Sequence, residues 1–161
     1  MYKLDELTRK DFIIGVDKRT KKYSKSVKGP KYLGITSDYV IHIGVPSVTS
    51  NPPTQYLVKI KMIDFPKIDE YTDLTVEEKV RLSLDGDISV SCTCPAYKFW
   101  GYKYIMTQLS SNEDTPEDRY PTVRNNKLEG TVCKHIFIAI RGFGKWWKKI
   151  ASDIVNSKFI S

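Results

Sequence analysis

The residues of this sequence best suited to chemistry are two short pairs of metal-binding side chains. Cys92 and Cys94 are separated by one residue, and so are Cys133 and His135. Thiolate sulfur and imidazole nitrogen are donors that zinc prefers, and three cysteines with one histidine form one of its standard tetrahedral sets. The chain has three cysteines, and this set uses all of them. Because four protein ligands leave no open coordination position, the pattern predicts one structural Zn²⁺ rather than a catalytic metal.

A blander interpretation treats the three cysteines as small buried hydrophobic side chains and His135 as a helix-surface residue. A Cys-x-Cys pair alone would be weak evidence against it. The matching Cys-x-His pair before a predicted helix favours the metal. His42 stands alone within an apolar segment, so we expect it to be a core or edge histidine.

The first ligand pair requires an element that brings both thiols to one side. Apolar residues alternate with polar ones from Val80 to Leu84 and again from Ile88 to Cys94, with Asp85-Gly86 between them. This pattern predicts a β-hairpin with a tight turn. Side chains at i and i+2 of a strand share a face, so the two thiols converge. Pro95 then ends the strand and begins a helix expected over residues 96–109.

The second ligand pair precedes an amphipathic helix. Apolar residues recur at spacings of three and four from Ile136 to Ile154, whereas residues 110–130 are polar and predict a long loop. Residues i and i+2 of a complete helix lie about 200° apart. We therefore expect Cys133 in the turn or cap before the helix and His135 in its first turn. Gly142 and Gly144 indicate either a kink or two shorter helices.

The N-terminal half is typical of β-structure. Three segments, Phe12 to Val16, Tyr39 to Val45 and Tyr56 to Phe65, are rich in strand-forming residues and are separated by turn-rich stretches. The fold class expected is therefore α+β, with a β-rich portion over residues 1–75 and a zinc portion over residues 76–161. Both portions are expected to form one domain spanning residues 1–161.

Composition bears on compartment and partners. Lysine and arginine number 26 against 19 aspartates and glutamates, so the surface is expected to attract polyanions. An odd number of cysteines argues against a secreted disulfide framework. Neither a signal peptide nor a membrane-spanning segment is evident, and the chain is expected to be a soluble protein made in a cytoplasm, without a membrane partner.

Two basic clusters are candidate partner-binding sites. The first lies between residues 18 and 31 and contains Lys18, Arg19, Lys21, Lys22, Lys25 and Lys28. Such density suits phosphate contact, or else a solvated loop that docks onto an acidic neighbour. The second consists of Arg141, Lys145, Lys148 and Lys149. Its alternative interpretation is the solvated face of an amphipathic helix.

The ligand pattern resembles a known family. Cys92-x-Cys94 and Cys133-x-His135, with a predicted hairpin before and a helix after, resemble the SWIM zinc finger. The segments SCTCPAYKF (residues 91–99) and NNKLEGTVCKHI (residues 125–136) are similar to SWIM-like proteins of tailed bacteriophages. The resemblance covers about residues 80–142, with a longer spacer than usual between the pairs. It implies a zinc-held module that contacts protein or DNA, in a viral protein.

Together these observations predict a non-enzymatic protein. The sequence has no phosphate-binding glycine loop, no Gly-x-Ser-x-Gly elbow and no His-Glu-x-x-His motif, and no small-molecule substrate is expected. The leading function is a zinc-stabilised docking or structural component of a phage head, neck or tail, with other subunits as partners and a virion location. The alternative is a nucleic-acid-binding SWIM protein that acts on DNA in the host cytoplasm.

Overall fold

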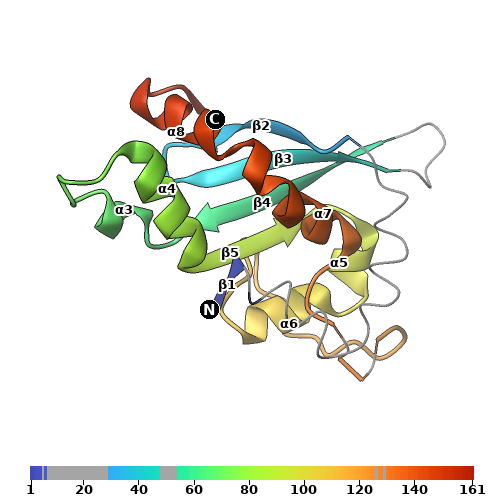
Figure 1. Ribbon diagram of the computed structural model, residues 1–161. Helices are drawn as coiled ribbons and strands as arrows, with labels where there is room; N and C mark the ends of the chain where they lie inside the picture. Colours follow the sequence, from blue (N-terminus) through green and yellow to red (C-terminus); the bar gives the residue numbers. More distant parts are fainter. Residues whose placement is uncertain (5, 7–28, 48–53, 126, 129) are drawn as a thin grey trace.

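The fold is built on one twisted antiparallel sheet. The computed structural model describes residues 1–4, 6, 29–47, 54–125, 127–128 and 130–161 (Figure 1). Within these residues six strands run in the spatial order β1-β5-β4-β3-β2-β6, and only the β2–β6 pair is parallel. The strands are β1 (Tyr2–Lys3), β2 (Lys31–Thr36), β3 (Val40–Pro46), β4 (Gln55–Met62), β5 (Asp87–Cys92) and β6 (Phe159–Ile160).

Side-chain alternation decides which face of the sheet is buried. Ile60 of β4 is paired with Ile41 of β3 and Val90 of β5, and all three are fully buried. Lys59 and Lys61 point to the opposite face and are only half-buried. The alternation therefore confirms the strands expected from Tyr39 and from Tyr56, although β4 ends before Phe65.

Helices cover the apolar face of the sheet. The helices are α3 (Phe65–Ile68), α4 (Val76–Asp85), α5 (Pro95–Phe99), α6 (Tyr102–Gln108), α7 (Lys134–Gly142), the 3-10 turn η1 (Phe143–Lys145) and α8 (Trp147–Val155). Helix α7 packs on β3, β4 and β5, α8 packs on β2, and α4 packs on α8 (Figure 1). This mixture of a sheet and helices confirms the α+β class. Among the described residues, no helix has the length and apolar character needed to cross a membrane.

The hairpin expected over residues 80–94 is wrong, because its first arm is helix α4. Thr75 accepts a hydrogen bond from the backbone of Glu78, whose carboxylate accepts one from the backbone of Thr75, so a capping box begins a helix here. Val80 and Leu84, four residues apart, are buried, whereas Leu82 is 46% exposed. That burial follows the helical period rather than the strand period. The antiparallel neighbours of β5 are consequently β1 and β4, and not a strand over residues 80–84.

The helix expected over residues 96–109 is two helices. Pro95 begins α5 as predicted, but Gly101 takes φ +84° and separates α5 from α6. An added Cβ at Gly101 would lie 2.9 Å from the ring of Pro121, so both the backbone and the packing require glycine.

The C-terminal amphipathic segment is also divided. Helix α7 ends at Gly142, η1 follows, and α8 begins at Trp147, so two shorter helices are found instead of one kinked helix. Ile136, Ile140 and Ile150 are buried, as the apolar spacing predicts. The strand expected from Phe12 to Val16 lies outside the described residues.

Candidate metal centre

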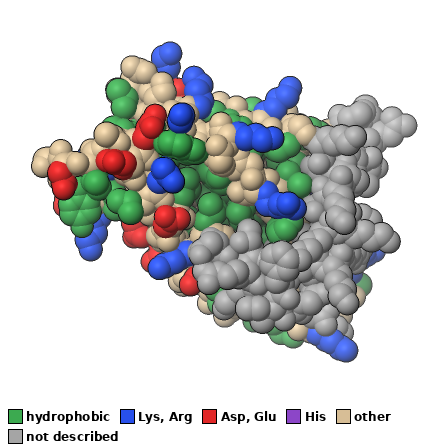
Figure 2. All heavy atoms as spheres, in the orientation of Figure 1, with side chains coloured by type: hydrophobic (Ala, Val, Ile, Leu, Met, Phe, Trp, Pro, Cys, Tyr) green, Lys and Arg blue, Asp and Glu red, His purple; other side chains and the backbone are tan. Residues whose placement is uncertain are grey.

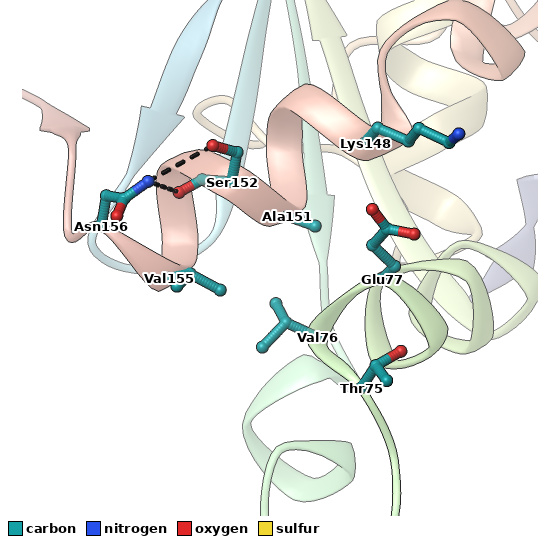
Figure 3. Close-up of a pocket in the computed structure, with 8 residues that line it drawn as sticks. All are labelled: Thr75, Val76, Glu77, Lys148, Ala151, Ser152, Val155 and Asn156. Atoms are coloured by element: carbon teal, nitrogen blue, oxygen red, sulfur yellow. Dashed lines mark hydrogen bonds between the residues drawn. The ribbon is translucent and has the colours of Figure 1, made fainter.

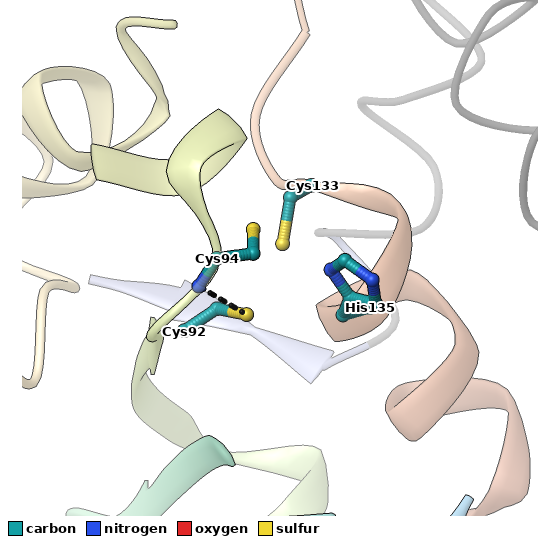
Figure 4. A group of neighbouring side chains, drawn as sticks. All are labelled: Cys92, Cys94, Cys133 and His135. Atoms are coloured by element: carbon teal, nitrogen blue, oxygen red, sulfur yellow. Dashed lines mark hydrogen bonds between the residues drawn. The ribbon is translucent and has the colours of Figure 1, made fainter. Parts of the chain in front are cut away.

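Four potential ligands meet at the junction of β5, α5 and α7. The sulfur atoms of Cys92, Cys94 and Cys133 and a ring nitrogen of His135 all lie within 4.8 Å of one another. No more than 2% of any of these residues is exposed. Their side chains point toward a common centre (Figure 4). The structure therefore brings together the two pairs that the sequence analysis singled out, and they form a cluster that can hold a metal ion.

The end of β5 and the start of α5 position the first ligand pair, Cys92 and Cys94. Cys92 is the last residue of β5 and pairs with Val58 of β4. Thr93 is then held to β4 by two hydrogen bonds, its N–H to the carbonyl of Leu57 (3.1 Å) and the N–H of Leu57 to its hydroxyl (3.0 Å). Cys94 is extended and caps α5, which begins at Pro95. Both thiols therefore face the same side although only Cys92 belongs to the strand.

The start of α7 positions the second ligand pair, Cys133 and His135. Cys133 is the extended cap residue of this helix, and its carbonyl accepts the first helical hydrogen bond, from the N–H of Phe137 at 3.1 Å. His135 lies in the first turn. The cap residue and the first turn face the same side, which satisfies the geometric condition derived from the sequence.

Backbone N–H groups point at the sulfur atoms. The N–H of Cys94 donates to Sγ of Cys92 at 3.5 Å, and the N–H of Tyr97 donates to Sγ of Cys94 at 3.3 Å. Such donors favour thiolate over thiol, because they stabilise negative charge on sulfur. They are the outer contacts expected around sulfur atoms that bind a cation.

Burial and charge act against one another at the three thiols. Hydrogen bonds from the thiols of Cys133 and Cys92 lower the pKa of Cys94. Burial raises the pKa of the Cys92 thiol and also that of the Cys133 thiol. Ionisation of all three, which metal binding requires, needs the positive charge of an ion at the centre.

His135 carries the clearest sign of a missing partner. Both ring nitrogens are buried, and neither has a hydrogen-bond partner among the described residues. A buried polar atom without a partner costs roughly 1–3 kcal/mol. A metal ion would take one nitrogen. The imidazole ring is fixed by Tyr56 of β4, whose ring centroid lies 4.7 Å away.

Two tyrosines beside the cluster were missed in the sequence. Tyr56 has the same parity along β4 as Val58 and Ile60, so strand alternation would have placed it on the buried face. Tyr97 is fully buried, and its hydroxyl donates to the carbonyl of Val90 at 3.0 Å. This bond anchors α5 to β5, which holds Cys94 beside Cys92. Nothing in the residue types alone indicated that role.

The structure describes only the second of the two basic clusters. Lys18, Arg19, Lys21, Lys22, Lys25 and Lys28 lie outside the described residues. Arg141, Lys145, Lys148 and Lys149 are exposed on α7, η1 and α8. Lys149 is committed to an ion pair with Asp153 at 3.2 Å.

Comparison of the chain with models of protein families, with curated proteins and with solved structures found no match.

Proposed function

We propose that the cluster holds one structural Zn²⁺ and that the protein is a non-enzymatic, zinc-stabilised docking protein. The observation that carries the proposal is the buried Cys92, Cys94, Cys133 and His135 set, in which neither nitrogen of His135 has a hydrogen-bond partner among the described residues. Sulfur atoms on a tetrahedral zinc with bonds of about 2.3 Å lie roughly 3.8 Å apart. Donors already within 4.8 Å reach that arrangement by small side-chain movements.

The donor set favours zinc over other ions. Calcium and magnesium prefer oxygen ligands, and no carboxylate of the described residues belongs to this cluster. Three thiolates and one imidazole suit zinc, which has no redox chemistry and accepts tetrahedral geometry without strain. The separation of the two pairs in the chain gives such an ion a structural effect, because it joins the end of β5 to the start of α7.

A closed ligand set supports a docking role rather than catalysis. Four protein donors leave no position for a substrate or a reactive water, and their burial excludes solvent. The resemblance to SWIM-like phage proteins extends the proposal to a component of a tailed-phage virion, with neighbouring subunits as partners. The rival function is nucleic-acid binding in the host cell, and the cations of α7, η1 and α8 favour it.

Elemental analysis tests the zinc proposal. We expect about one zinc per chain in the purified protein and loss of most of it in Cys92→Ser and His135→Ala, because each removes one of four donors. His42→Ala is the matched control, since His42 is the other histidine of the chain and lies on β3 outside the cluster. Reduced protein without metal, or equal zinc loss in His42→Ala, would contradict the proposed site.

Association with particles tests the docking role. We expect the protein to copurify with assembled phage particles through a density gradient, and mass spectrometry of the particles to detect it in stoichiometric amount. The Cys133→Ser variant should be depleted from particles, because its docking surfaces depend on the zinc-held fold. A protein found only free in the infected-cell lysate would favour the rival function.

A further inference from the structure

A cationic surface extends along the C-terminal helices. Between residues 134 and 158, six lysine and arginine residues accompany one carboxylate, that of Asp153. This carboxylate forms an ion pair with Lys149. Arg141, Lys145 and Lys148 are exposed and have no ion-pair partner among the described residues. Figure 2 shows lysine and arginine side chains over this face, with hydrophobic side chains between them and acidic side chains beside them toward α3 and α4.

Arg81 of α4 joins this surface across the helix interface. Its guanidinium carbon lies 5.0 Å from the ring centroid of Trp147, and the ammonium of Lys148 lies 5.4 Å from the same ring. Glu77 and Asp85 are each four residues from Arg81, the spacing of helical ion pairs, yet neither forms one with it in the described residues. The guanidinium is instead directed toward α8.

Convergence of two cations on one indole has two consequences. Neither cation forms an ion pair with a carboxylate among the described residues, so binding of an external anion would offset their mutual repulsion. The ring itself is covered by charge, so Trp147 is not left open as an apolar anchor for a protein partner or as a stacking platform for an unpaired base. The chemistry that this surface offers is contact with phosphate groups.

We propose that Arg81, Arg141, Lys145 and Lys148 form a surface that binds the phosphate backbone of double-stranded DNA without reading its sequence. Release of condensed counterions favours DNA over an acidic protein face, since it rewards several separate cations at once. The footprint ends at α4, where Glu77 lines a shallow pocket with Lys148. The ammonium of Lys148 points away from the other residues of that pocket (Figure 3). This inference specifies the ligand and the residues of the rival nucleic-acid-binding function, and it requires none of the metal ligands.

Fluorescence anisotropy with a labelled 20-base-pair duplex of arbitrary sequence tests the surface. The full chain should bind at 50 mM NaCl and weaken steeply by 200 mM. Arg81→Gln combined with Lys148→Gln should lower affinity at least about tenfold and reduce the slope of log affinity against log salt by about 2. Lys98→Gln combined with Lys127→Gln removes the same charge from exposed positions on α5 and in the loop before α7. That control should lose less than about threefold.

Further measurements distinguish a specific contribution of these residues from effects of net charge or misfolding. The charge-preserving variant Arg81→Lys with Lys148→Arg should bind within about threefold of the parent, and all variants should retain the parent's zinc content and melting temperature. Absence of duplex binding at 50 mM NaCl would overturn the inference. So would equal losses in the patch and control variants, since net charge alone would then explain binding. Tighter binding of polyglutamate than of duplex would assign the surface to an acidic protein.

Discussion

Removal of the proposed Zn²⁺ is expected to lower the melting temperature of the protein by about 10–20 °C. Structural zinc sites contribute apparent binding free energies of about 10–16 kcal/mol in small zinc-binding peptides, comparable with the whole unfolding free energy of a domain. If half of the smaller figure, about 5 kcal/mol, is coupled to folding, a chain of this length loses roughly 2–4 °C per kcal/mol. Differential scanning calorimetry before and after dialysis against a strong chelator measures the shift.

The Cys133→Ser variant separates metal loss from other effects of the chelator. Cys133 caps α7 and contributes a buried sulfur, so its replacement should lower the melting temperature of untreated protein by a similar amount. Chelator should then change the variant little. A parent protein whose melt is unchanged after verified metal removal would show that the cluster is not coupled to folding. A large chelator effect on the variant would place the coupling elsewhere.

The Ile60→Ala variant is expected to lose about 3 kcal/mol of unfolding free energy. Ile60 lies on the central strand β4, is fully buried, and is flanked by Ile41 and Val90 on the neighbouring strands. Removing its branched side chain loses transfer free energy and leaves a cavity that paired strands cannot close, and such changes cost about 2–5 kcal/mol. Urea denaturation of the metal-loaded protein should show a lower midpoint at an unchanged slope.

Lys61→Ala is the matched control in the same strand. Lys61 is on the opposite face of β4, where it forms an ion pair of 3.9 Å with Asp38 on a partly exposed surface. Partly exposed pairs of this kind contribute about 0–1 kcal/mol, so the variant should unfold close to the parent midpoint. Equal destabilisation by the two substitutions would contradict the assignment of the buried face.

Local patterns predicted the ligand cluster because each ligand pair is set by adjacent residues. Extended backbone through Cys92 and Cys94, Pro95 at the start of a helix, and Cys133 as a helix cap are short-range features, and the structure contains all of them. They did not specify Tyr56, which contacts His135 from a strand remote in sequence. Such contacts follow from strand order, which local patterns do not encode.

The hairpin prediction was wrong because apolar residues near Val80 fit two periods. Val80, Leu82 and Leu84 alternate as a strand would, while Val76, Val80 and Leu84 follow a helix. The capping pair Thr75 and Glu78 favours the helix, and packing on α8 makes it the stable choice. A nine-residue apolar pattern is too short for periodicity alone to decide.

The residues themselves determined the donor set, the α+β class and the amphipathic character of the C-terminal segment, since each depends on side-chain chemistry or on spacing within one element. Tertiary structure decided the rest. It selected helix over strand for α4, placed Arg81 and Lys148 beside Trp147, and paired Lys149 with Asp153. These outcomes depend on which distant elements pack together, because burial and ion pairing are properties of the assembled chain.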